Sequence, residues 1–265
     1  MLSALLSALI RYRGFVVGSV KREFQSRYRT SMLGALWLVL QPLAMILVYT
    51  VIFSEVMRSR MPGVPSKFGY SVYLCAGAIT WGLFAEIITR SQGVFVDNAN
   101  LIKKLSFPRI ALPMIVTISS LINFAIIFSL FTIFLLVTGN FPGIPFLALI
   151  PLLIVQIVFS IGLGITLGVL NVFFRDVGQF MGIFVQFWFW FTPIVYPRHV
   201  LPDSLKPWIA LNPMADLILG YQTILVDRAW PNWNLVWPVL ILGLLLCMLA
   251  LHLFRHHAAE MVDEL

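Results

Sequence analysis

Residues 32–54 read MLGALWLVLQPLAMILVYTVIFS, a run of 23 residues without a charged side chain. As a helix that rises ~1.5 Å per residue, this run is roughly 35 Å long. The hydrocarbon core of a bilayer is ~30 Å thick, so the segment can cross it with some tilt. We therefore expect residues 32–54 to form a transmembrane helix.

Five further apolar stretches follow the first. They cover approximately 70–89, 110–138, 146–174, 177–197 and 235–254, and none contains Lys or Arg. Apolar residues make up 60% of the chain, charged residues make up 11%, and the mean hydropathy is +0.94, which lies outside the range of soluble domains. The sequence predicts an all-α integral membrane protein with six transmembrane helices. We expect a single transmembrane domain over residues 1–265, which uses nearly all of the chain and leaves no room for a soluble catalytic domain.

The basic residues predict the orientation in the membrane. Of the 18 Lys and Arg residues, six lie in external segments when the N-terminus is placed in the cytoplasm, and the other twelve lie in cytoplasmic segments. The external six are Arg58, Arg60, Lys67, Arg198, Lys206 and Arg228. Because cytoplasmic loops are enriched in Lys and Arg, we expect both termini in the cytoplasm. This retention of basic loops accounts for the net charge of +7, and we expect no binding of nucleic acid.

The N-terminal residues 1–31 predict an interfacial helix. Val17, Val20, Phe24 and Tyr28 share one helical face, and basic residues occupy the other faces. A basic amphipathic helix before a span tends to lie in the headgroup plane, where each Lys or Arg near anionic lipid contributes about 1 kcal/mol. The alternative is a plain basic anchor, which needs the charge but not the apolar face. We favour an interfacial helix in contact with membrane lipids.

The segment 198–234 is too apolar for a simple loop, and four prolines interrupt it. Between Met214 and Asp227 the apolar residues follow a helical period, but fourteen residues cannot cross a bilayer. We expect short re-entrant or interfacial helices on the outer side, between spans five and six. An ordinary external loop is the alternative.

The cytoplasmic loop 91–109 joins spans two and three. A short helix in this loop would present Leu101, Ile102 and Leu105 beside Lys103 and Lys104. Such a mixed apolar and basic surface suits docking in a groove on another protein. Spacing alone equally allows a solvated loop.

Four motifs resemble those of type-2 ABC exporter permeases for polysaccharides. They are RYRTSMLGALWLVLQPL at 27–43, NANLIKKLSFPR at 98–109, NVFFRDV at 171–177 and NPMAD at 212–216. The similarity covers nearly the whole chain. Any one of these motifs is weakly specific, but four motifs in the same order across six spans make a specific match. The family includes permeases for O-antigen, capsule and teichoic acid chains, and the O-antigen (Wzm-like) permeases resemble this chain most closely.

The resemblance implies a homodimer in which each copy pairs with a cytoplasmic ABC ATPase subunit. The exported substrate would be an undecaprenyl-linked polysaccharide, most closely O-antigen, crossing the bacterial inner membrane. The chain lacks the G-x-x-x-x-G-K-[ST] motif, so ATP and Mg²⁺ are expected in the partner ATPase and no cofactor in this chain. By the same resemblance, the residues that couple to the ATPase would be Asn98, Asn100, Leu101, Ile102, Lys103, Lys104 and Leu105. The external gate would include Asn212, Pro213, Met214 and Tyr221.

Aromatic side chains crowd the fifth predicted span. Flat rings can stack on sugar rings while a polymer slides past, although aromatic residues also anchor proteins at membrane interfaces. They occupy more than one side of this helix, so some must face lipid or protein. The candidate channel residues are Trp37, Phe184, Phe187, Trp188, Phe191 and Tyr196.

Several polar or small residues have structural interpretations. Glu86 is an intramembrane carboxylate, which suggests function, but a pair with Arg90 four residues later is favoured. Ser160, Gly164 and Gly168 recur every four residues and predict close helix packing within the bundle. His252 and His256 lack a third metal ligand, so we expect no metal site. No arrangement suggests catalysis.

Other classes of protein fit the sequence less well. A membrane-bound glycan transferase should carry acidic or metal-binding motifs in an aqueous loop, and this chain has only scattered Asp residues there. A drug or small-lipid ABC exporter would share the architecture but not the polysaccharide motifs. A structural scaffold would leave the loop 91–109 and the external segment without a purpose.

Overall fold

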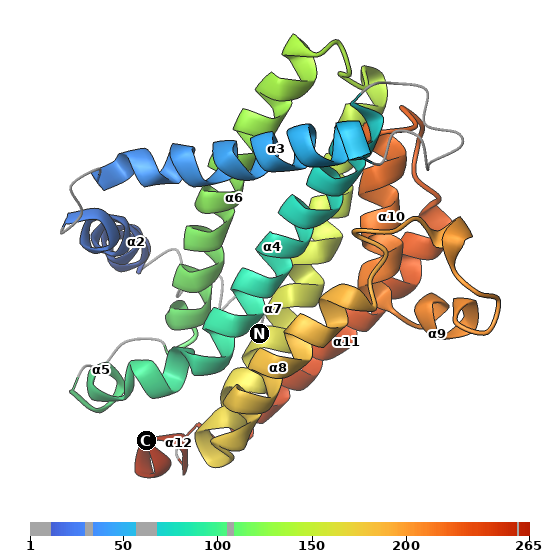
Figure 1. The fold of residues 1–265 in the computed structure, drawn as a ribbon. Helices are drawn as coiled ribbons and strands as arrows, with labels where there is room; N and C mark the ends of the chain where they lie inside the picture. The colour runs from blue at the N-terminus through green and yellow to red at the C-terminus, as the bar shows by residue number, and fades with distance from the viewer. Residues whose placement is uncertain (1–11, 30–33, 57–67, 105–108, 259) are drawn as a thin grey trace.

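The computed structural model describes residues 12–29, 34–56, 68–104, 109–258 and 260–265 (Figure 1). Every regular element in these ranges is a helix, and four helices there are long and apolar enough to cross a bilayer. They are α4 (Gly69–Asp97), α6 (Ala111–Val137), the continuous stretch of η2 (Ile144–Ala148) and α7 (Leu149–Phe173), and α11 (Trp233–His256). The protein is therefore an all-helical, multi-pass membrane protein. These four helices coincide with the second, third, fourth and sixth predicted spans.

The other two predicted spans form shorter helices. The short 3₁₀ turn η1 (Gly34–Leu36) leads into α3 (Trp37–Val56), whose apolar part covers Trp37–Ile52. Helix α8 (Asp176–Trp190) has 15 residues, a rise of roughly 22 Å that is less than the ~30 Å hydrocarbon core. It ends early because Pro193 disfavours helical backbone at the residue before it. The chain then continues in turns through residues 191–196.

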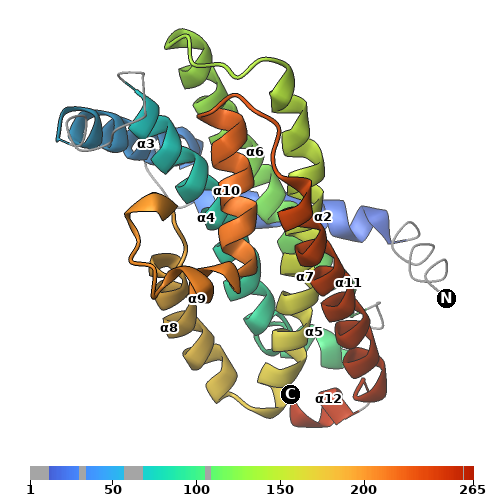
Figure 2. The same cartoon turned by 90° about the vertical axis from the view of Figure 1, so that its right-hand side faces the viewer.

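The long helices of the bundle share one approximate direction, and helices α2 and α3 lie transverse to them. In Figure 1, α4, α6, α7, α8 and α11 lie roughly along one direction, whereas α3 lies across α4 and α6. Figure 2 shows α2 (Arg13–Arg29) lying across the same bundle. Helix α7 is central, because it packs against α4 on one side and α11 on another.

Small residues bring the central helices into close contact. A Cβ atom at Gly168 would lie 2.6 Å from the carbonyl oxygen of Ser91 on α4, and one at Gly164 would lie 2.8 Å from the Ser91 Cβ. A Cβ atom at Gly162 would lie 2.7 Å from a backbone nitrogen of α11. The predicted packing of Gly164 and Gly168 within the bundle is thus confirmed.

Helix α2 packs on the N-terminal half of α6. Val16 and Val20 are buried there, and Phe24 packs beside them. Val17, which was expected on the same face, is 66% exposed, and the side chain of Tyr28 lies outside the described residues. The face that packs on α6 is therefore centred one residue earlier than predicted.

Short helices fill the segment between α8 and α11. They are η3 (Arg198–Val200), α9 (Lys206–Ala210) and α10 (Pro213–Leu225). Helix α10 packs against α4, α7 and α11 (Figure 2). Its side chains Met214, Leu217 and Tyr221 are buried in the main apolar cluster. The predicted helical period of this segment is confirmed through Leu225.

Candidate functional site

The loop between α4 and α6 forms the short helix α5 (Ala99–Lys104) at one end of the bundle (Figure 1). Asn98 ends α4, and its side-chain amide donates to the Val94 carbonyl oxygen at 2.8 Å. The Asn98 carbonyl oxygen accepts the backbone amides of Leu101 and Ile102 at 3.0 Å each, which begins α5. Residues 91–97 of the predicted loop belong to α4, because no proline interrupts the helix before Asn98.

The two faces of α5 differ in chemistry. Ile102 is 6% exposed and packs in an apolar cluster with side chains of α4, α6, α7 and α11. Asn100, Lys103 and Lys104 are exposed, and Leu101 is half-buried. Leu105 lies outside the described residues. The surface that α5 offers to another protein is therefore mainly polar and basic, and Ile102 attaches the helix to the bundle.

The C-terminal helix α12 (Glu260–Glu264) packs against α5 and α7. Met261 is fully buried in the same apolar cluster as Ile102. Arg109, which begins the return to α6, donates a hydrogen bond to the Ala258 carbonyl oxygen. Sequence reasoning missed this contact, and the available signal was the pair of apolar residues Met261 and Val262 among acidic neighbours.

Asn212 joins the C-terminal end of α8 to the start of α10. Its Oδ1 accepts the backbone amide of Met214 at 3.1 Å and the indole N–H of Trp188 at 2.8 Å. Its Nδ2 donates to the Thr192 hydroxyl at 3.0 Å. Asn212 is thus the N-cap of α10, with Pro213 at the first helical position. The Asn212 side chain thus accepts hydrogen bonds both from the first turn of α10 and from the half-buried Trp188 indole.

Further bonds hold the turns after α8. The Tyr73 hydroxyl of α4 lies 3.0 Å from the carbonyl oxygens of Pro193 and Tyr196. Gln222 of α10 donates to the Pro193 carbonyl oxygen at 3.1 Å. Arg198 forms an ion pair with Asp216 of α10 at 2.7 Å. Hydrogen bonds and an ion pair therefore attach the segment between α8 and α10 to both α4 and α10.

The structure places the predicted gate residues in two environments. Asn212 and Pro213 begin α10, where Asn212 makes the contacts described above. Met214 and Tyr221 are fully buried inside the bundle. The Tyr221 hydroxyl has no hydrogen-bond partner among the described residues.

The predicted channel residues also divide. The exposed members are Trp37, Phe184, Phe187 and Phe191. Trp188 instead points inward, with its ring centroid 5.1 Å from that of Phe84. Tyr196 is half-buried, and its hydroxyl donates to the Trp190 carbonyl oxygen at 2.6 Å. Among the predicted residues of this region, Trp188 is used for packing, whereas the rings of Phe184, Phe187 and Phe191 stay exposed.

An ionic network joins α2, α4 and α6. Arg90 contacts Glu86 at 3.1 Å, so the predicted pair four residues apart is confirmed. Arg90 also contacts Glu23 of α2 at 2.5 Å, and the second Glu23 oxygen accepts the Ser119 hydroxyl at 2.8 Å. Asn123 of α6 donates to the second Glu86 oxygen at 2.9 Å. The parts played by Glu23, Ser119 and Asn123 depend on tertiary contact and were not predicted.

The described residues hold no group of three or more His, Cys, Asp or Glu side chains arranged for a metal ion. Of the histidines, His257 contacts Glu260 at 2.6 Å and the ring of Phe173 edge-on. These contacts connect α12 to the end of α7.

Comparison with known proteins defines the class. Residues 16–226 match the ABC-2 type transporter family. The chain belongs to this family, and it is the membrane permease component of an ABC transporter rather than an enzyme. The resemblance seen in its four motifs is thereby confirmed.

The similar proteins include two O-antigen export permeases and a polysialic acid transport protein. The O-antigen export system permease protein RfbA of Klebsiella pneumoniae is 32% identical over 235 residues, 88% of each chain. The protein of the same name from Myxococcus xanthus is 28% identical over 263 residues, 98% of this chain and 99% of the relative. The polysialic acid transport protein KpsM of Escherichia coli is 24% identical over 198 residues, 74% of this chain and 75% of the relative.

Proposed function

We propose that this chain is the transmembrane subunit of an ABC transporter that exports an undecaprenyl-linked polysaccharide, O-antigen, across a bacterial inner membrane. ATP and Mg²⁺ bind to a separate cytoplasmic ATPase, two copies of which pair with two copies of the permease. The observation that carries the proposal is the likeness to O-antigen export permeases over 88–98% of the chain.

The proposed topology has six crossings and both termini in the cytoplasm. Helices α4, α6, α7, α8 and α11 cross the bilayer along the bundle, and α3, which lies across α4 and α6 in Figure 1, must tilt toward their direction to make the first crossing. Helix α2 lies in the cytoplasmic interface, and α9 and α10 form the external re-entrant segment. The packing of α12 on α5 supports an even number of crossings after α5, because it places the C-terminal segment beside the loop between α4 and α6. Helix α8 is short, so the turns at 191–196 complete its crossing, or the bilayer thins locally.

The channel forms between the two permease copies. The exposed rings of Phe184 and Phe187 on α8, of Phe191 just after it and of Trp37 on α3 provide flat apolar surfaces that contact sugar rings without binding them tightly. Such surfaces suit a polymer that must keep moving. Trp188 and Tyr196 hold the α8 end in place, and the start of α10 at Asn212 forms the external gate.

Helix α5 docks on the ATPase through its exposed face. Asn100, Lys103 and Lys104 make the contact, and Ile102 positions the helix from the buried side. A basic surface also steers association with an acidic partner surface. The position of α5 at the end of α4 allows movement of the ATPase to reach α4 and α6.

Charge reversal tests the docking surface. In a Lys103→Glu/Lys104→Glu variant, co-purification of the cognate ATPase should fall at least about tenfold, since both cations change sign. Lys206→Glu on the external side is the matched control and should leave recovery unchanged. Ile102→Asp is unsuitable, because it would place a carboxylate in a buried apolar cluster. Undiminished recovery of the ATPase with the double variant would remove the docking role from α5.

Deletion of the gene tests the cargo. We expect the O-antigen ladder to disappear from gels of lipopolysaccharide, with the undecaprenyl-linked polymer retained in the cells and the ladder restored by the intact gene. An unchanged ladder refutes O-antigen export. Loss of a capsule instead would assign the protein to capsule export.

A further inference from the structure

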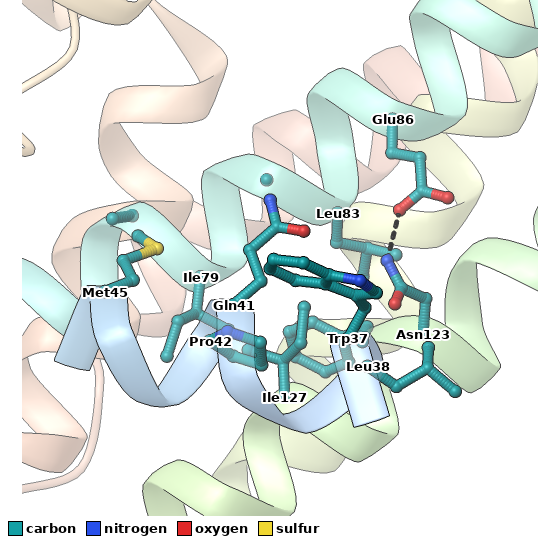
Figure 3. A pocket seen from close by; sticks show the side chains of 13 residues that line it. Trp37, Leu38, Gln41, Pro42, Met45, Ile79, Leu83, Glu86, Asn123 and Ile127 are labelled. Carbon is teal, nitrogen blue, oxygen red and sulfur yellow. Dashed lines mark hydrogen bonds between the residues drawn. The ribbon is translucent and has the colours of Figure 1, made fainter. Parts of the chain in front are cut away.

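A pocket opens between α3, α4 and α6 (Figure 3). Its volume is about 530 Å³, within the range of roughly 300–1,000 Å³ that is typical of small-molecule sites. Most of its lining is apolar and includes Ile79 and Phe124. Three polar side chains interrupt this lining, and they come from different helices: Gln41, Glu86 and Asn123.

The polar groups converge on one aromatic ring. In Figure 3, the Trp37 indole lies in the middle of the pocket with Gln41 beside it, both from α3, and Glu86 and Asn123 lie opposite. Trp37 is 47% exposed, so part of its ring remains uncovered. An aromatic surface with a few oriented polar groups is the usual composition of a ligand site.

Hydrogen bonds fix the positions of Glu86 and Asn123, which form the wall opposite Trp37. One Glu86 oxygen accepts from Arg90 at 3.1 Å, and the other accepts from Asn123 at 2.9 Å. Arg90 is itself bonded to Glu23 of α2. Because carboxylate oxygens have about four lone-pair sites in all, Glu86 can still accept a further bond from a ligand. The amide oxygen of Asn123 is a second acceptor on this wall.

The chemistry of the pocket fits uncharged hydroxyl groups. Gln41 and Asn123 can each donate and accept, Glu86 accepts, and a hydroxyl group can do both. The exposed indole surface complements the apolar face of a sugar ring. We propose that this pocket binds a saccharide unit of the exported chain, an inference that rests on the export function proposed above.

The charges oppose binding of the lipid phosphate here. Glu86 is the charged side chain among the described lining residues, and its carboxylate repels an anion in a partly desolvated site. Arg90 is engaged by two carboxylates and does not line the pocket. The pocket therefore selects the sugar part of a lipid-linked polymer rather than its phosphate.

The pocket lies near the middle of the bundle. Its α4 lining runs from Ala78 to Glu86, around the midpoint of a helix that covers Gly69–Asp97, and its α6 lining includes Asn123 and Ile127. Under the proposed topology, the pocket is therefore near the bilayer midplane, and Glu86 is the α4 lining residue nearest to the cytoplasmic side. A ligand bonded to Glu86 also contacts the network that reaches α2 through Arg90.

Direct binding tests the pocket. The permease–ATPase complex in nanodiscs is titrated with radiolabelled oligosaccharide released by mild acid from the host's own lipid-linked polymer. Trp37→Ala/Gln41→Ala removes the aromatic surface and one amide, and we expect the dissociation constant to rise at least about tenfold. Leu40→Ala, also at an exposed position on α3 but outside the pocket lining, should bind as the wild type does.

The outcomes separate this inference from the export proposal. An equal dissociation constant for the pocket variant and Leu40→Ala overturns the inference, as does failure of the wild type to bind oligosaccharide. A parallel titration with undecaprenyl phosphate should be unaffected by the pocket variant, and a loss confined to that titration would assign the pocket to the lipid instead. Failure of the complete lipid-linked polymer to stimulate ATP hydrolysis by the wild type overturns the export proposal itself. Gln41→Ala alone provides a milder second variant that should weaken oligosaccharide binding in the same direction.

Discussion

Helices α4 and α7 approach so closely at Gly168 that even one methyl group should destabilise the bundle. The Cβ of an alanine there would lie 2.6 Å from the Ser91 carbonyl oxygen and 3.2 Å from a ring carbon of Phe95. Ordinary contact begins at 3.4 Å, so the two backbones must separate by roughly 0.8 Å. Overpacking of this kind costs about 1–3 kcal/mol, and separation of the helices also weakens dispersion contacts along the interface. We expect Gly168→Ala to lower the free energy of unfolding by about 2 kcal/mol.

A matched glycine on α8 gives the comparison. A Cβ at Gly182 meets nothing within 4 Å, so Gly182→Ala gains helix propensity without a clash and should stabilise by up to about 1 kcal/mol. Thermal unfolding of the purified permease in detergent, followed by tryptophan fluorescence, measures both variants. The two midpoints should move in opposite directions. If Gly168→Ala unfolds at the same temperature as Gly182→Ala, the close packing of α4 and α7 is not what holds this part of the bundle together.

Three further substitutions test other contacts. Met261→Asp places a carboxylate in the apolar cluster that α12 shares with α5, so limited proteolysis of the 97–109 region should become severalfold faster. Met261→Leu should be cleaved at the wild-type rate. Equal cleavage rates for Met261→Asp and the wild type would show that α12 does not support α5. Asn212→Ala removes the cap of α10 and leaves the Trp188 indole N–H without its acceptor, so the free energy of unfolding should fall by about 2 kcal/mol. Asn232→Ala, which removes only the exposed cap of α11, should cost about 1 kcal/mol or less, and equal losses for the two asparagines would contradict the double role of Asn212. Tyr221→Phe deletes a buried hydroxyl that has no partner among the described residues, so the thermal midpoint should stay level or rise, and a clear fall would reveal a hydrogen bond of that hydroxyl.

The long helices could be predicted from local sequence because each one satisfies its own backbone hydrogen bonds in the membrane. Runs of apolar residues therefore indicate α4, α6, α7 and α11 without knowledge of their neighbours. The lengths of shorter elements were less predictable. Helix α8 stops at Trp190 because of Pro193, although the apolar composition continues to residue 197.

The orientation of individual side chains was harder to predict than the helices. Trp188 and Phe187 are adjacent aromatic residues in the same apolar run, yet the indole packs inward and bonds to Asn212, whereas Phe187 is 63% exposed. Ile102 looked suited to docking, but α12 and the ends of four other helices bury it. An apolar residue in a membrane protein can face lipid, protein or a channel, and its type does not distinguish the three.

By itself, the sequence determined the membrane class, the main helices, the close-packing glycines and the family. These depend on composition, on local periodicity and on motifs within short windows. Tertiary structure alone decided that Glu23 of α2 meets Arg90 of α4, that Met261 supports α5, and that Trp37, Gln41, Glu86 and Asn123 surround one pocket. The physical reason is sequence distance: Glu23 and Arg90 are 67 residues apart, and Arg109 and Ala258 are 149 apart. Such contacts are set by how the helices cross one another, and no local pattern in the chain records that geometry.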